Sequence, residues 1–101
     1  METHKNLALV LDPSDNVATV LSNIERGDRV HLKGTAGEVV ATEAVGFGHK
    51  IALRYIRAGE SIIKYGQKIG YATVDIKPGD WVHLHSMASE VDVDFRTRIE
   101  R

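Results

Sequence analysis

Short stretches of alternating apolar and polar residues recur along the chain. In residues 29–33, RVHLK, the apolar Val30 and Leu32 fall on one face and the polar residues fall on the other. This period of two is typical of a β-strand with one buried face. Similar apolar or alternating patterns occur in residues 7–11, 38–45, 61–65 and 90–95. The pattern therefore predicts a mostly β chain built from short strands.

One segment also fits a helix. Residues 14–24 place Val17, Val20, Leu21 and Ile24 at helical spacing, and a serine precedes them as a candidate cap. The β-branched residues of this segment favour a strand instead. The segment also aligns with the start of a repeated motif. We therefore expect a strand or turn here.

The repeated motif has the form x-Ile-x-x-Gly-acid-x-(Val/Ile) and occurs three times, at residues 23–30, 55–62 and 75–82. Its glycine falls where a tight turn needs a positive φ, and in the third copy Pro78 sets the φ of the preceding turn position. The Ile and Val positions are expected to pack inward. Three unevenly spaced copies predict one compact β domain with recurring corners rather than a solenoid.

Glycines also predict the other connections. Residues 34–37 read as a hairpin turn and residues 46–48 as a loop that needs backbone freedom. The length of 101 residues fits a single domain. We expect that domain to span residues 1–86, with residues 87–101 as a C-terminal tail or docking segment.

Composition excludes several classes of function. A net charge of −1, from 13 basic and 14 acidic residues without a basic stripe, argues against a nucleic-acid partner. The chain has no cysteine, so it carries no thiol nucleophile and no cysteine-ligated metal. The longest apolar run, residues 7–11, is far shorter than the roughly 20 residues of a membrane helix. With no secretory signal pattern at the start, we expect a cytoplasmic protein with no membrane partner.

Two histidines form the first candidate site. His83 and His85 are two residues apart, so on a strand both imidazoles point to the same face, together with Trp81. Such a pair can converge on one divalent ion, because imidazole suits Fe, Zn, Mn or Ni. The alternative is an ordinary polar strand face. His31 has only the cationic neighbours Arg29 and Lys33 on its face, which weakens a metal role for it.

The second candidate site is His49-Lys50, which follows a glycine-rich loop. A lysine offers a point charge and a histidine offers a titratable donor, so this pair suits an anionic substrate such as a carboxylate. The alternative is a solvated pair at the end of an ordinary loop. Neither pair includes a recognisable general base or nucleophile.

The ordered run of motifs in residues 46–85 resembles a known family. These motifs are GHKIAL at 48–53, IIKYGQKIGYAT at 62–73 and DIKPGDWVHLH at 75–85. Together they look like the N-terminal SAF (β-clip) domain of the altronate/galactarate dehydratase family of sugar-acid hydro-lyases. The resemblance implies a compact SAF/β-clip fold with short strands and tight glycine turns. It also implies dehydration of a sugar acid such as D-altronate to a 2-keto-3-deoxy acid with a divalent metal, usually Fe2+ or Mn2+.

The resemblance also assigns residues and partners. His49 and Lys50 match the family's His-Lys at the active-site loop, and His83 and His85 match its H-x-H. Where members commonly carry asparagine after that pair, this chain has Ser86. In the family the main catalytic body is a much larger region, which in some members is a separate subunit. That large subunit would supply the general base and could hold the metal.

Three functions follow as hypotheses. The first is the small subunit of a metal-dependent sugar-acid dehydratase, a lyase that is inactive without its large catalytic subunit. The second is the small subunit of a sulfolactate sulfo-lyase, a related enzyme that releases sulfite. The third is a module that binds a carboxylate or a metal without chemistry. A homo-oligomer is compatible with each of them.

Overall fold

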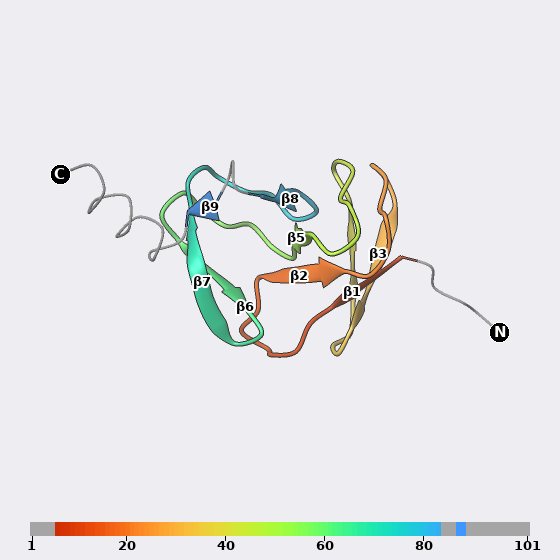
Figure 1. Cartoon of the computed structure of the whole chain (residues 1–101), viewed down its shortest axis with the longest axis horizontal. Helices are drawn as coiled ribbons and strands as arrows, with labels where there is room; N and C mark the ends of the chain where they lie inside the picture. Colours follow the sequence, from red (N-terminus) through yellow and green to blue (C-terminus); the bar gives the residue numbers. More distant parts are fainter. Residues whose placement is uncertain (1–5, 84–86, 89–101) are drawn as a thin grey trace.

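The computed structural model describes residues 6–83 and 87–88, which form short strands joined by turns and bends and contain no helix (Figure 1). The strands form a six-stranded sheet in the order β4-β3-β1-β2-β5-β8 and a three-stranded sheet in the order β6-β7-β9. All neighbours pair antiparallel except β1 and β3, which are parallel. The strands are β1 (Leu7–Leu9), β2 (Val17–Val20), β3 (Arg29–Lys33), β4 (Glu38–Val40), β5 (Lys50–Ala52), β6 (Ser61–Lys64), β7 (Gln67–Ala72), β8 (Trp81–Val82) and β9 (Met87–Ala88). The prediction of a mostly β fold with short strands and glycine turns is confirmed.

Within these residues no helix is long and apolar enough to cross a membrane. The predicted strands at 7–11 and 38–45 are shorter in the structure, since β1 ends at Leu9 and β4 at Val40. Residues 90–95 lie outside the described part. The domain boundary at residue 86 stays a prediction, and β9 lies just after it and pairs with β7.

The segment that also fitted a helix contains strand β2. It is buried on both faces, because the core is divided into two clusters. Val17 belongs to one cluster, and Ala18 and Val20 belong to the other. A central strand that contacts two cores carries apolar residues at nearly every position, so Val17 and Val20 also fall at helical spacing, while Leu21 lies beyond the strand and is exposed. The strand alternative was therefore correct.

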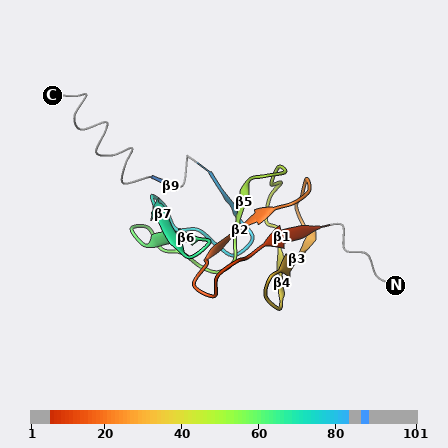
Figure 2. The ribbon, with the colours of Figure 1, turned by 60° about the horizontal axis from the view of Figure 1, so that its bottom comes forward.

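The two clusters lie on either side of β2 and β5. The hairpin of β6 and β7 closes one side, and β1, β3 and β4 close the other (Figure 2). Strand β5 contributes Ile51 to the first cluster and Ala52 to the second, and β8 adds Val82 to the second. Strands β2 and β5 are thus the central partition of the molecule.

The three predicted turns share one geometry. Their glycines have φ of +90°, +90° and +91° (Gly27, Gly59 and Gly79). In each turn the backbone N–H of the acid donates to the carbonyl three residues earlier, at 3.0, 2.9 and 3.0 Å (Asp28, Glu60 and Asp80). The carboxylate of the same acid accepts a hydrogen bond from the N–H of that earlier residue, at 2.8, 2.6 and 2.9 Å. A positive φ at the third position is the mark of a type II turn and explains the glycine.

A fourth copy of the turn was missed in the sequence. Residues 46–49 form it, with φ of +85° at Gly48 and a 2.9 Å hydrogen bond from the His49 N–H to the Gly46 carbonyl. The copy does not match the sequence motif, because it carries Val45 in place of isoleucine and His49 in place of the acid. The four turns associate in two pairs, held by the antiparallel bridges Ile24↔Val45 and Ile56↔Ile76.

Two buried polar residues join the hairpin of β6 and β7 to the large sheet. The Asn16 side chain donates to the Ser61 carbonyl at 2.8 Å and accepts from the Ile63 N–H at 2.7 Å. The Asp15 carboxylate accepts from the N–H of Gly66 at 2.8 Å. Because buried polar groups require partners, these bonds fix the position of the hairpin tip relative to β2.

Candidate functional site

The side chain of His49 occupies the position at which the other three turns carry an acid. It folds back over its own turn, so that a Cβ added to Gly46 would lie 3.2 Å from Cδ2 of His49. The imidazole also meets the ring of Trp81 edge-on, with centroids 5.5 Å apart and an interplanar angle of 81°. Within the described residues His49 makes no hydrogen bond like those of the three carboxylates. Its side chain therefore lies over its own turn, with the imidazole against the Trp81 ring.

Trp81 connects His49 to His83. Trp81 lies in β8, opposite Ile51 of β5, and is half-buried. Its ring contacts the His83 ring at a centroid distance of 4.3 Å with a tilt of 49°. The predicted proximity of Trp81 and His83 is thus confirmed, although β8 ends at Val82 and His83 directly follows the strand. Continuing the register of β5 and β8 by one residue places His49 across from His83.

The indole of Trp81 adds an unusual feature to this aromatic group. Its Nε1 is buried and has no hydrogen-bond partner among residues 6–83. Buried donors are normally satisfied, so the indole N–H is available to an acceptor that comes from outside the described part of the chain. His49, Trp81 and His83 together present two imidazoles and one indole donor.

The described residues do not complete a metal site. They contain no group of three or more histidine, cysteine, aspartate or glutamate side chains arranged to hold an ion. His49 and His83 provide two imidazoles, whereas catalytic zinc sites, for example, use three protein ligands. The second predicted ligand, His85, lies outside the described residues. The assignment of His83 and His85 to a metal therefore stays a prediction.

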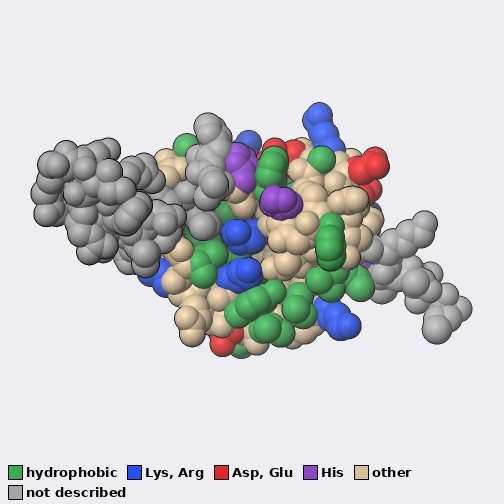
Figure 3. Space-filling view, in the orientation of Figure 1, with side chains coloured by type: hydrophobic (Ala, Val, Ile, Leu, Met, Phe, Trp, Pro, Cys, Tyr) green, Lys and Arg blue, Asp and Glu red, His purple; other side chains and the backbone are tan. Residues whose placement is uncertain are grey.

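Lys50 belongs to a different set of contacts from His49. In β5 it lies opposite Thr19 of β2 and Val82 of β8. It is half-buried, and burial lowers the pKa of its ammonium group, with a further lowering from the charge of Lys64. Histidine and basic side chains gather near the middle of one face of the molecule (Figure 3). The structure thus brings Lys50 toward Lys64, and His49 toward Trp81 and His83.

Sequence reasoning missed Lys64 and Tyr65. These residues lie at the tip of the hairpin of β6 and β7, where Tyr65 adopts a positive φ of 55°. Its hydroxyl donates to Thr19 Oγ1 at 3.1 Å, and Lys64 Nζ lies 5.0 Å from the centroid of its ring. Gly66, which follows one strand-like run and precedes another, is the signal of such a tight hairpin, whereas Tyr65 is not a residue that this turn favours. The sequence does not reveal that the tip lies against Thr19.

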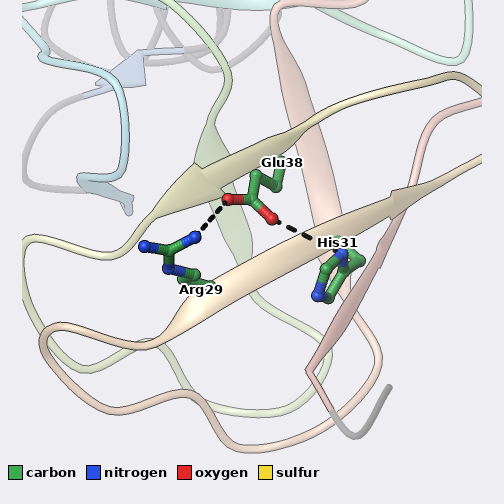
Figure 4. Close-up of polar contacts among 3 residues, drawn as sticks. All are labelled: Arg29, His31 and Glu38. Carbon is green, nitrogen blue, oxygen red and sulfur yellow. Dashed lines mark hydrogen bonds and ion pairs between the residues drawn. The ribbon is translucent and has the colours of Figure 1, made fainter. Parts of the chain in front are cut away.

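His31 lies apart from this site, on the hairpin of β3 and β4. Its Nδ1 is 3.6 Å from Oε1 of Glu38, whose Oε2 is 3.2 Å from Nη1 of Arg29 (Figure 4). Glu38 therefore balances the cationic face expected around His31. Strands β4 and β8 form opposite edges of the large sheet, so this ion group is a separate surface feature.

The sequence is similar to those of known proteins. Residues 6–90 match the family described as Altronate/galactarate dehydratase SAF domain. The altronate dehydratase of Bacillus subtilis (strain 168) is 43% identical over 72 residues, which are 71% of this chain and 14% of that protein. The altronate dehydratase of Escherichia coli (strain K12) is 40% identical over 81 residues, which are 79% of this chain and 16% of that protein.

A third relative is much smaller. The (2R)-sulfolactate sulfo-lyase subunit alpha of Paracoccus pantotrophus is 38% identical over 48 residues, which are 48% of this chain and 72% of that protein. The relatives are thus dehydratases and lyases, and this chain spans only a small part of the two altronate dehydratases. Because the family match extends over most of its residues, the chain belongs to the altronate/galactarate dehydratase SAF domain family.

Proposed function

We propose that this chain is the small part of a sugar-acid dehydratase and works with a much larger catalytic polypeptide. The reaction is the loss of water from a sugar acid such as altronate to give a 2-keto-3-deoxy acid. Similarity to two altronate dehydratases supports the substrate class. The chain spans 14% and 16% of those proteins, which supports a large partner. We expect the chain to be inactive alone.

The observation that carries the proposal is the replacement of the acid by His49 in one of four equivalent turns. In the other three turns the carboxylate closes a hydrogen bond onto the backbone. Such a bond contributes about 1 kcal/mol to stability. His49 does not make this bond to the turn backbone. Its ring contacts Trp81, whose ring in turn contacts His83. A departure from the locally favoured residue is expected where function selects the side chain.

The chemistry places clear demands on the site. A base removes the proton on the carbon next to the carboxylate, electrons form the C=C bond, and the β-hydroxyl leaves as water after protonation. The resulting enol then becomes the 2-keto acid. Lys50 would bind the carboxylate, and His49 or His83 would hold a proton at a substrate hydroxyl. The base would come from the large polypeptide.

A divalent ion, Fe2+ or Mn2+, is part of the proposal. His83 and His85 would contribute imidazoles to it, with further ligands from the partner, and the bound ion would stabilise negative charge on the substrate. Two histidines at i and i+2 support this assignment. Metal content of the purified complex, compared between wild type, His83→Ala and His85→Ala, tests it. Undiminished metal in both variants would refute the ligand role.

The experiment for the proposed function uses a reciprocal pair of variants. The tagged chain is purified from its host with the large polypeptide that accompanies it, and the complex is assayed for 2-keto-3-deoxy acid formed from altronate. His49→Asp should lower kcat by about 100-fold or more, a typical loss of a proton-transfer group. The control Asp28→His alters an equivalent turn and should leave kcat unchanged. Equal activity of His49→Asp and wild type would contradict the role of His49.

A second function has its own support. The sulfo-lyase subunit alpha is a short chain, of which the match covers 72%. The same complex is therefore offered sulfolactate, and released sulfite is measured. Sulfite release without altronate dehydration would assign the chain to the sulfo-lyases. A chain that retains no large polypeptide and catalyses neither reaction would instead be a binding module.

A further inference from the structure

We propose that Lys50 and Lys64 together form a carboxylate-binding site, with the hydroxyl groups of Thr19 and Tyr65 at its edge. Its ligand is the carboxylate of the sugar acid. This inference rests on the proposed function, because that function supplies the sugar acid. It extends the function by adding Lys64, Tyr65 and Thr19 to the substrate-binding residues and by separating them from His49.

The two lysines bring two positive charges together. Lys50 and Lys64 are close enough for the charge of Lys64 to lower the pKa of Lys50. Both are half-buried, and neither forms an ion pair with a carboxylate in the part of the chain that the structure describes. Two ammonium groups repel each other, and burial weakens their hydration. An anion from outside would relieve both effects.

The described carboxylates at the hairpin tip are already engaged elsewhere. Asp15 accepts hydrogen bonds from the backbone N–H groups of Leu11, Asp12 and Gly66. Asp12 accepts from the backbone N–H and the hydroxyl of Ser14. In the part of the chain that the structure describes, no carboxylate forms an ion pair with either lysine. The positive charge is therefore a standing feature of this surface.

The hairpin tip is held in a fixed arrangement. Tyr65 has a positive φ, which a residue with a side chain adopts rarely. Such a conformation persists where the surroundings impose it, and it is common at ligand sites. The Tyr65 hydroxyl rests on Thr19, and Lys64 lies over the Tyr65 ring. Lys64 is thus held near Lys50 before any ligand arrives.

Thr19 and Tyr65 add hydroxyl groups beside the two lysines on this side of the molecule. Thr19 lies directly opposite Lys50 across β2 and β5, so the two side chains project from the same face of the sheet. Lysine is a point charge with rotatable donors and suits a carboxylate in several orientations. Hydroxyl groups can add hydrogen bonds to the same anion or to a neighbouring sugar hydroxyl. The combination predicts preference for an acid over the corresponding neutral polyol.

The test uses the full chain, labelled with nitrogen-15 and followed by its backbone amide signals. It is titrated with D-altronate, with the neutral polyol altritol and with inorganic phosphate. Altronate should shift the signals of residues in β5 and of the hairpin tip at 64–66, and altritol should not. Lys50→Met and Lys64→Met should each weaken altronate binding at least tenfold. The control Lys33→Met changes an exposed lysine of β3 and should have no effect.

The contrary outcomes are distinct. Unchanged altronate binding by Lys64→Met, or equal shifts with altritol, would overturn the site. Equal binding of phosphate would show an unspecific anion site and would also overturn it. Loss of the large polypeptide from Lys64→Met, with altronate binding intact, would assign the lysines to a carboxylate of the partner instead.

The inference and the proposed function can fail separately. If the purified complex forms neither 2-keto-3-deoxy acid nor sulfite, the proposed function fails, whereas the amide signals still report whether the lysines bind altronate. If the complex is active and Lys64→Met leaves KM for altronate unchanged, the carboxylate site fails and the function stands. A raised KM with unchanged kcat would support both.

Discussion

The replacement of Gly79 by alanine, compared with the same change at Gly59, isolates the energy of one close backbone approach. Both glycines occupy the third position of equivalent turns, with φ of +91° and +90°. A Cβ added to Gly59 meets nothing within 4 Å, whereas a Cβ added to Gly79 would lie 2.0 Å from the carbonyl oxygen of Val40. The two variants thus share the conformational cost and differ in the steric one.

The magnitudes follow from these two contributions. An alanine forced to a positive φ costs about 1–2 kcal/mol, which is the expected loss for Gly59→Ala. Relief of an overpacked contact costs about 1–3 kcal/mol more, because the end of β4 or the turn must move. Gly79→Ala should therefore lose about 2–5 kcal/mol, a large share of the about 5–15 kcal/mol that stabilises a typical domain.

Urea and thermal unfolding, followed by far-ultraviolet circular dichroism, measure both variants. The additional loss in Gly79→Ala should appear as a Tm lower by about 4–8 °C for each kcal/mol. Equal unfolding free energies for Gly59→Ala and Gly79→Ala would refute the close approach of Gly79 and Val40. A Gly59→Ala variant as stable as wild type would refute the reading of the turns as type II.

Three further changes test other parts of the structure. Lys50→Met should be more stable than wild type at pH 7, because burial disfavours the charged ammonium group of Lys50 in the folded state. The pKa of Lys50 is lower in the folded chain than its ordinary 10.5, so the unfolded chain binds more protons as the pH rises toward 10.5. Wild type therefore gains stability over that range through Lys50, and the variant does not. Urea unfolding at pH 7 and pH 10 measures this, and a less stable variant at pH 7 would contradict it. Asn16→Ala removes two hydrogen bonds to β6 and should cost about 2–4 kcal/mol. Asn23→Ala, which removes one exposed bond, should cost less, and equal losses would speak against the role of the buried amide. His49→Asp should match or exceed wild type in Tm and change the fluorescence of Trp81; a clear loss of stability would show that the fourth turn differs from the others.

The sequence revealed the turns only where every position of the motif was filled. The three copies with an acid were found, because glycine and carboxylate have local roles that the sequence displays directly. The fourth copy, at residues 46–49, carries His49 at the acid position and was read as a plain loop. Its geometry depends on a bridge from Val45 to the distant Ile24, which a local motif does not contain.

In the candidate site, too, the contacts between residues close in the sequence were predictable and those between distant residues were not. The contact of Trp81 with His83 follows from the period of two within one strand. The contact of His49 with Trp81 depends on the pairing of β5 and β8, which lie far apart in the sequence. The approach of Lys50 to Lys64 depends on the docking of one sheet against the other through the buried Asn16. Such long-range relations are set by tertiary packing, so they escaped the sequence.

The paired turns define two tandem units between β2 and β8, and the two units overlap. Ile24 corresponds to Ile56 and Val45 to Ile76, so the run from β2 to β5 is repeated by the run from β5 to β8. Strand β5 closes the first unit and opens the second. Neither half of the chain is therefore complete without it, and a cut on either side of β5 would deprive one unit of its border strand. Lys50 lies on this common strand and His49 directly precedes it, so both lie at the segment that the two units share.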